Sequence, residues 1–128
     1  LVEMGLTPEL TRRGAIAVAP PAAASGPARA LVAHADTIGA IVRELKPTGR
    51  LKLAPIGTHS ARFAEGARVT LFVDDPDTSY TGTVLPLKAS GHRWADEVDT
   101  QGVGWQHVEL RLDEPVESAE DLRALGVH

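Results

Sequence analysis

Alternation of apolar and polar residues in the second half of the chain predicts a series of short strands. In Leu51-x-Leu53 and Val69-x-Leu71-x-Val73 the apolar side chains recur at every second position, so they share one face of an extended segment. Residues typical of turns separate these runs, with Pro47 and Gly49 in the first connection and an acidic stretch in the second. We predict two hairpins and one further strand in an antiparallel sheet or small barrel, with strands at Ala40–Leu45, Leu51–Ala54, Val69–Val73, Tyr80–Leu85 and Val108–Leu112.

The remainder of this half contains a loop and a terminal helix. Lys88–Gly104 has no hydrophobic period, and we interpret it as a long loop. Ser118 is a typical helix N-cap, Asp121 stands at the position of a capping box, and Gly126 is a typical terminator. A short helix is therefore predicted between Ser118 and Gly126.

The first third of the chain has a different character. Leu1–Met4 is compatible with the last turn of a helix, and two short strands are predicted at Glu9–Arg13 and Ala15–Ala19. Pro20–Pro27 is rich in Pro, Ala, Ser and Gly, which predicts a surface loop. Arg29–Ala33 is almost wholly apolar, as in strands covered on both faces. This third therefore suggests the edge of an α/β layer.

The candidate chemistry lies within Ala30–Val42, where a His and an Asp interrupt an apolar run. In an extended segment His34 and Asp36 project from the same face. A carboxylate beside an imidazole fixes its tautomer and raises its basicity, which suits a metal ligand. His-x-Asp is common by chance, however, and an ordinary histidine with a solvated neighbour is the alternative.

Composition limits the possible functions. The 128 residues fit one average domain, 43 per cent of them are hydrophobic, and the formal net charge is −4. The 13 Lys and Arg residues are scattered, so we expect neither nucleic acid nor a membrane as a partner. The chain has no Cys, so any metal must be held by His, Asp or Glu. There is no signal-peptide pattern, so a cytoplasmic location is the default, and the absence of a starting Met suggests a piece of a longer protein.

The other histidines and the acidic stretch carry weaker signals. His92 lies in the predicted long loop and could reach a substrate or a subunit interface. His59 is interpreted as a solvated loop residue, and His107 and His128 as structural or incidental. The acidic stretch after Val73 lacks the Gly and distal Glu of a calcium loop, so it is interpreted as a turn.

Several sequence blocks together resemble a known family. In order and spacing they are similar to the cellulase-M-like, glutamyl and deblocking aminopeptidases, and they cover nearly the whole chain. Two further blocks, Thr58–Arg62 and Lys88–His92, resemble the members found alongside synthesis of a dipeptide-amide osmoprotectant. The main blocks are Ala33–Gly39, Leu51–Gly57, Glu65-Gly66-x-x-Val69, Gly82–Val84, Trp105, Ser118–Leu122 and Leu125–Val127.

The resemblance implies a fold and a site. Residues 1–38 would be the N-terminal fragment of an α/β zinc-peptidase domain, and residues 39–128 an inserted antiparallel β module, PDZ-like or barrel-like, used for subunit association. Such enzymes assemble as dimers and dodecamers and hydrolyse the N-terminal residues of peptides with two divalent metals, Zn or Co. His34 matches the first metal ligand, and Asp36 matches the residue that orients or polarises the site.

The resemblance also implies that the chain lacks part of the site. The family's bridging Asp, general-base Glu and remaining ligands follow the inserted module, whereas this sequence stops at His128. One imidazole holds a metal far more weakly than three or four ligands. We therefore expect this chain alone to be inactive and to bind no metal. The alternative is a free-standing β module that binds a protein or peptide along a sheet edge, without catalysis.

Overall fold

The structure is a computed structural model that describes residues 1–19, 26–27 and 29–128. The chain divides into two units, Leu1–His34 and Ala35–His128. The predicted loop Pro20–Pro27 lies almost entirely outside the described residues. The boundary predicted between residues 38 and 39 is close to this division, but the assignment of the two parts to a peptidase domain and its insertion stays a prediction.

The first unit contains a small hairpin. A 3-10 helix, η1 (Val2–Met4), precedes strands β1 (Pro8–Leu10) and β2 (Ile16–Val18), which pair in antiparallel orientation. Gly14 turns the chain between them with a φ of 82°. The two predicted strands are therefore present, although shorter than expected. None of the described residues of this unit is buried, so the hairpin has no core of its own.

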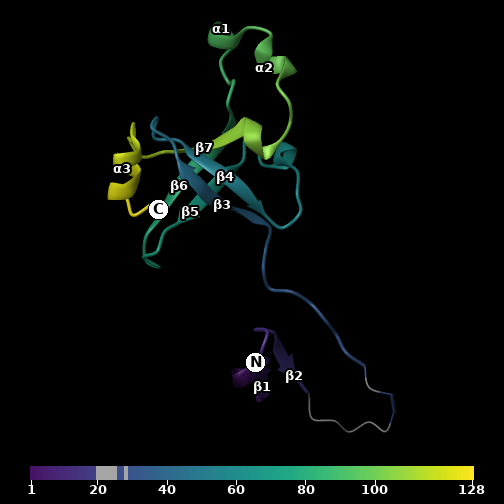
Figure 1. Ribbon diagram of the computed structural model, residues 1–128. Coiled ribbons are helices and arrows are strands. Elements are labelled where there is room, and N and C mark those ends of the chain that lie inside the picture. The colour runs from purple at the N-terminus through teal and green to yellow at the C-terminus, as the bar shows by residue number, and fades with distance from the viewer. Residues whose placement is uncertain (20–25, 28) are drawn as a thin grey trace. The chain divides into compact units, whose positions relative to one another are not determined.

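The second unit is built on a five-stranded antiparallel sheet (Figure 1). The predicted hairpins are confirmed, since β3 pairs with β4 and β5 pairs with β6. The last strand in sequence, β7, lies between the two hairpins, so the order across the sheet is β3-β4-β7-β6-β5. The strands span Gly39–Leu45 (β3), Leu51–Ile56 (β4), Arg68–Phe72 (β5), Ser79–Pro86 (β6) and Val108–Leu112 (β7).

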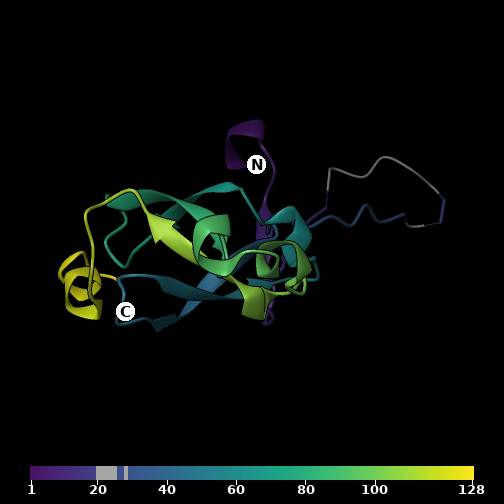
Figure 2. The ribbon, with the colours of Figure 1, turned by 90° about the horizontal axis from the view of Figure 1, so that it is seen from above.

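The sheet curls into a half-barrel around its core (Figures 1 and 2). β4 and β7 are joined by a single register pair, Leu51 with Leu110, whereas β6 and β7 pair over five positions. Alternate residues of these strands point inward and are buried, which is the expected consequence of the period of two. The buried cluster comprises Leu51, Leu53, Ala61, Val84, Val108, Leu110, Leu112, Leu122 and Val127.

The predicted terminal helix is confirmed as α3 (Ala119–Ala124), which contributes Leu122 to the core. The Ser118 hydroxyl accepts a hydrogen bond from the backbone N–H of Asp121, and the Asp121 carboxylate accepts one from the N–H of Ser118. This is the capping box expected from the sequence. Gly126 then takes a φ of 79°, a left-handed conformation that Gly adopts at low cost.

The strand predicted at Arg29–Ala33 is wrong. Residues 29–38 have no helix or strand, and the first sheet residue of this region is Gly39. Leu31 and Val32 are almost fully exposed. A strand forms only where a neighbour completes its hydrogen-bond ladder, and no described residue pairs with this run.

The loop predicted at Lys88–Gly104 is also partly wrong, because it contains two helical turns, α1 (Gly91–Trp94) and α2 (Glu97–Thr100). In Figure 1 they extend away from the sheet. Residues 88–101 are called the lobe below. Polar contacts hold the lobe together in place of a hydrophobic core. Its sequence therefore has no apolar period from which the two helical turns could be predicted. Two further 3-10 helices, η2 (Ala61–Phe63) and η3 (Trp105–His107), connect strands.

Candidate functional site

His34 and Asp36 lie in the segment between the hairpin and β3. His34 is the last residue of the first unit and Asp36 the second residue of the second unit, and both side chains are exposed. Neither residue is in a strand, so the alternation that places them on one face does not apply in this structure. Their assigned roles, metal ligand for His34 and catalytic residue for Asp36, stay predictions.

A zinc site needs three or four ligands. Among the described residues, no group of three or more His, Cys, Asp or Glu side chains lies close enough to hold a metal ion. The imidazole of His34 and the carboxylate of Asp36 are suitable ligands for Zn or Co, but two donors do not complete a catalytic site. The described residues therefore do not form a metal centre by themselves.

His92 is exposed in the first turn of α1, at the lobe. The lobe is closed at its base by the Gln101 side chain, whose amide donates to the Lys88 carbonyl (3.0 Å) and whose oxygen accepts from the Lys88 N–H (3.3 Å). An ion pair between Lys88 and Glu97 crosses the same base. Neither helix of the lobe contains a buried residue, so these polar contacts define its shape.

Trp94 organises the tip of the lobe. The cationic groups of Lys88 and Arg93 lie 5.4 Å and 5.0 Å from the centre of its ring, within the range of cation–π attraction. Ala95, which follows, has a φ of 46°, a strained conformation for a residue other than Gly. The lobe thus holds His92 in a defined position away from the sheet.

His59 differs from the expected solvated loop histidine, because it is partly buried against Trp105. The two rings are 5.0 Å apart in an edge-to-face arrangement, and the Trp105 indole N–H donates to the His59 carbonyl at 3.2 Å. The Nδ1 atom of His59 is buried without a hydrogen-bond partner among the described residues. The two residues are 46 positions apart, so no local sequence signal could have predicted this contact.

The outer face of the sheet carries an ion pair that was not predicted. Arg68 of β5 donates to the Asp113 carboxylate, with Nη1 2.8 Å from Oδ1, and Thr81 of β6 donates to the same carboxylate at 2.6 Å. Hydrogen bonds from Arg68 and Thr81 hold the pKa of Asp113 well below its usual range, and the pair raises the pKa of Arg68. These charges are satisfied within the chain, so they are interpreted as structural.

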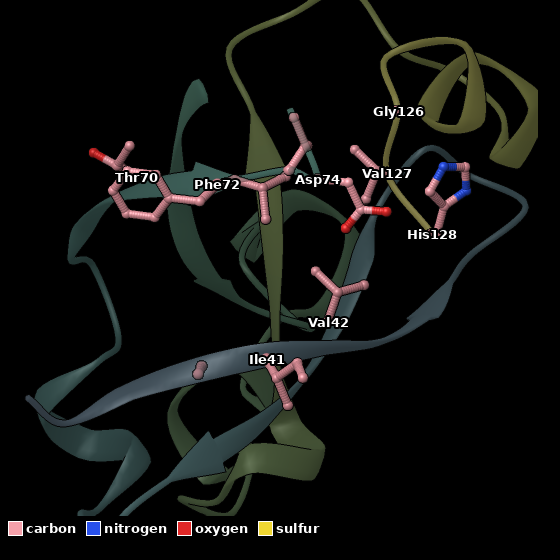
Figure 3. Close-up of a pocket in the computed structure, with 11 residues that line it drawn as sticks. Ile41, Val42, Thr70, Phe72, Asp74, Gly126, Val127 and His128 are labelled. Atoms are coloured by element: carbon pink, nitrogen blue, oxygen red, sulfur yellow. The ribbon is translucent and has the colours of Figure 1, made fainter. Parts of the chain in front are cut away.

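The acidic stretch after β5 is a turn, as predicted. Asp75 accepts hydrogen bonds from the Thr78 hydroxyl and the Asp77 N–H, which lower its pKa. Asp74, by contrast, faces a groove of about 370 Å³ between β5 and β3 (Figure 3). The groove is a second feature that depends on tertiary structure, because its walls come from residues some 30 positions apart and no motif marks it.

The sequence is similar to known aminopeptidase sequences. Residues 14–128 match the model described as M42 glutamyl aminopeptidase. The chain is 37 per cent identical over 99 residues to the Bacillus subtilis (strain 168) protein named "Putative aminopeptidase YhfE", covering 77 per cent of this chain and 28 per cent of the relative. It is 30 per cent identical over 92 residues to the glutamyl aminopeptidase of Lactococcus lactis subsp. cremoris (strain MG1363). That match covers 71 per cent of this chain and 24 per cent of the relative.

The family match extends over both sides of the His34-x-Asp36 segment and through the half-barrel. The chain spans about a quarter of the length of the curated relatives it matches. In the described part of the chain, every helix is too short or too polar to span a membrane. The family model covers most of the sequence, and the chain belongs to the M42 glutamyl aminopeptidase family.

Proposed function

We propose that this chain is part of a metal-dependent aminopeptidase that removes N-terminal residues from peptides. The observation that carries the proposal is the family match over residues 14–128, which includes the His34-x-Asp36 segment. In this role His34 binds the first of two divalent metals, Zn or Co, and Asp36 orients or polarises the site. The metals, when bound, supply Lewis acidity and an activated water for amide hydrolysis.

The half-barrel has a different role in this proposal. Residues 39–128 form a module inserted into an α/β peptidase domain, of which residues 1–38 are the N-terminal edge. The exposed Leu31 and Val32 support this arrangement, because an apolar run of this kind is normally covered on both faces. The module mediates homo-oligomerisation, as dimers or dodecamers, and the enzyme is cytoplasmic. Thr58–Arg62 and Lys88–His92 support membership of the osmoprotectant-associated subgroup.

His92 is proposed as a substrate-side residue. The lobe holds it on a projection with no buried residues, and such a projection can reach a neighbouring subunit or a bound peptide. Substitution His92→Ala in the longer enzyme is expected to raise KM for peptides while leaving metal content unchanged. Equal KM values for the parent and the variant would remove His92 from the proposal.

The metal roles are tested by substitution in the longer enzyme that contains these residues. We expect His34→Gln to abolish stoichiometric binding of one metal and to lower kcat/KM by about a hundredfold or more, because the site loses a direct ligand. Asp36→Asn should retain metal but lower kcat. Glu120→Gln, which changes an exposed carboxylate of α3, is the matched control and should leave both the metal content and kcat unchanged.

The same account predicts that the 128-residue chain alone has no aminopeptidase activity and no bound metal. Metal analysis after dialysis against zinc, together with an assay on aminoacyl amides, measures both. Stoichiometric zinc with amidase activity in this chain would contradict the proposal that further ligands are required.

A second function, peptide binding along a sheet edge, is favoured by a separate observation. The two outer strands of the half-barrel, β3 and β5, pair with only one neighbour each among the described residues. Their open edges line the same groove. This function does not depend on His34, Asp36 or a metal.

A further inference from the structure

The ladder between β3 and β4 begins close to Asp36 in the chain. Its first pair joins Gly39 to Ile56, and the residues just before Gly39 are in no strand. Asp36 belongs to the same compact unit as the half-barrel. Ile38 lies two residues after Asp36, so the chain keeps their Cα atoms within about 7 Å of each other. The position of Asp36 therefore depends on how Ile38 is held beside the half-barrel.

Gly57 lies beside the Ile38 side chain at the end of this ladder. A continued antiparallel register would place the two residues opposite each other, one step beyond the pair of Gly39 and Ile56. Gly57 has a φ of 80°, so the chain turns away here instead of extending the ladder. A Cβ atom at Gly57 would lie 3.3 Å from Cγ2 of Ile38. Two carbons attract best at about 3.5–4.0 Å, so the missing side chain of Gly57 makes room for this methyl group.

Ile38 has little freedom to move this methyl group away. Cγ2 is bonded directly to Cβ, so it changes place only when χ1 rotates or when the backbone shifts. Rotation about χ1 is restricted because Ile is branched at Cβ. A side chain at position 57 is therefore accommodated by a shift of a few tenths of an ångström at Ile38. The backbone passes such a shift along the chain toward Asp36.

The contact is separate from the core of the half-barrel. Ile38 is 66 per cent exposed and is not among the residues that pack against the buried cluster. Truncation of its side chain should therefore leave the stability of the half-barrel almost unchanged. What the contact determines is the direction in which the chain leaves the sheet.

We propose that Ile38 and Gly57 are positioning residues for the aminopeptidase reaction, because their contact sets where Asp36 stands relative to the half-barrel. Both residues act through Asp36 and not on the substrate. The half-barrel then contributes to catalysis within its own subunit, in addition to its proposed role in association. This inference rests on the proposed function, in which Asp36 orients or polarises the site.

Substitutions of Ile38 in the longer aminopeptidase are the direct test. Ile38→Val keeps both branches at Cβ and loses only Cδ1, so kcat should be unchanged. Ile38→Ala removes Cγ2 and should lower kcat about fivefold, because small displacements of a catalytic group are costly. KM and metal content should stay the same, since neither substrate contacts nor metal ligands are removed. Ile41→Ala removes the same atoms from an exposed side chain of β3 and should leave kcat unchanged.

Gly57 is tested by a double-mutant cycle with Ile38. Gly57→Ala should lower kcat about fivefold, for the same reason. Gly66→Ala is the matched control, because Gly66 has a φ of 79° but open space around it, so backbone strain alone should leave kcat unchanged. Addition of Gly57→Ala to Ile38→Ala should lower kcat no further, because Cγ2 is already absent and both changes act through one contact.

The contact itself is measured by NMR in the 128-residue chain, where no activity is needed. We expect a nuclear Overhauser effect between the Cγ2 methyl group of Ile38 and the Hα protons of Gly57. Backbone chemical shifts of residues 36–38 should change in Gly57→Ala and stay the same in Gly66→Ala. Absence of this Overhauser effect, or equal shift changes in the two variants, would overturn the inference.

The kinetic outcomes separate this inference from the proposed function. A parent enzyme without aminopeptidase activity would overturn both. With an active parent, the positioning role alone is overturned if Ile38→Ala or Gly57→Ala leaves kcat unchanged, or if their losses add in the double variant. Equal losses in Ile38→Val and Ile38→Ala, or in Gly57→Ala and Gly66→Ala, would also overturn it.

Discussion

Two five-residue segments in which apolar residues predict a strand have different structures in this chain. Val108–Leu112 forms β7, the central strand of the sheet, with Val108, Leu110 and Leu112 buried. Arg29–Ala33 forms no strand, and Leu31 and Val32 are almost fully exposed. The two segments differ in their neighbours. β7 lies between β4 and β6, whereas no described residue pairs with Arg29–Ala33. Strand-forming sequence becomes a strand only when a ladder and a covering layer are both present.

The largest expected effect contrasts the two runs directly. Leu110→Ala should lower the free energy of unfolding by about 2–5 kcal/mol, because it leaves a cavity among Leu51, Val84 and Leu122. Leu31→Ala removes the same atoms from an exposed side chain and should change the free energy of unfolding by less than about 0.5 kcal/mol. Urea unfolding of both variants measures the contrast. Similar losses would mean that the run at Arg29–Ala33 is also packed.

A smaller effect is expected at the tight turn that joins β3 and β4. Gly49 has a φ of 70°, and a Cβ atom there would lie 2.5 Å from the carbonyl oxygen of Val116. Gly49→Ala therefore combines backbone strain with a collision and should cost about 2–4 kcal/mol. Gly66→Ala has a similar φ of 79° but open space around it, so strain alone should cost about 1–2 kcal/mol. Equal losses in thermal unfolding would contradict this placement of Val116.

The helix caps provide a matched pair with an intermediate effect. Ser118→Ala removes the hydrogen bond to the Asp121 N–H and should destabilise the protein by about 1 kcal/mol. Ser90 occupies the corresponding position before α1 but makes no capping hydrogen bond, so Ser90→Ala should be close to neutral. Chemical unfolding distinguishes them, and a loss at Ser90 equal to that at Ser118 would show that the lobe is more tightly packed than described.

The smallest expected effect concerns pH. The hydrogen bonds from Arg68 and Thr81 depress the pKa of Asp113 in the folded chain. The folded state therefore binds fewer protons than the unfolded state, and this contribution is present above the unfolded pKa of about 4 and lost as pH falls below it. Asp113→Asn should flatten the stability curve between about pH 4 and pH 2. An unchanged slope would show that the pair does not form in solution.

The sequence was sufficient for features that depend on local chemistry. The hairpin turn at Gly49, the capping box of Ser118 and Asp121, and the alternating strand of Val108–Leu112 each follow from residues close in the chain. Central placement of β7 between the two hairpins did not follow, because it depends on packing between distant segments. The lobe was missed because Gln101 and Lys88 replace a hydrophobic pattern with polar contacts.

The candidate sites also divide into those that local sequence indicates and those that depend on distant segments. His34 and Asp36 were found from their spacing and the family resemblance, but their geometry could not be predicted because it requires a strand that residues 29–38 do not form. The contact between His59 and Trp105 and the groove between β3 and β5 carry no sequence signal, since each joins segments some 30 or more positions apart. Sequence analysis thus identified the family, whereas the roles of His34 and Asp36 stay predictions and the surfaces were not predicted.

Amide hydrogen exchange compares the two segments most directly, in the 128-residue chain and in the longer aminopeptidase proposed above. The account predicts that Val108–Leu112 is protected in both, whereas residues 31–38 exchange rapidly in the short chain and become protected in the longer enzyme. Protection of residues 31–38 in the short chain, or rapid exchange there in both proteins, would contradict the claim that this segment is the edge of a second domain.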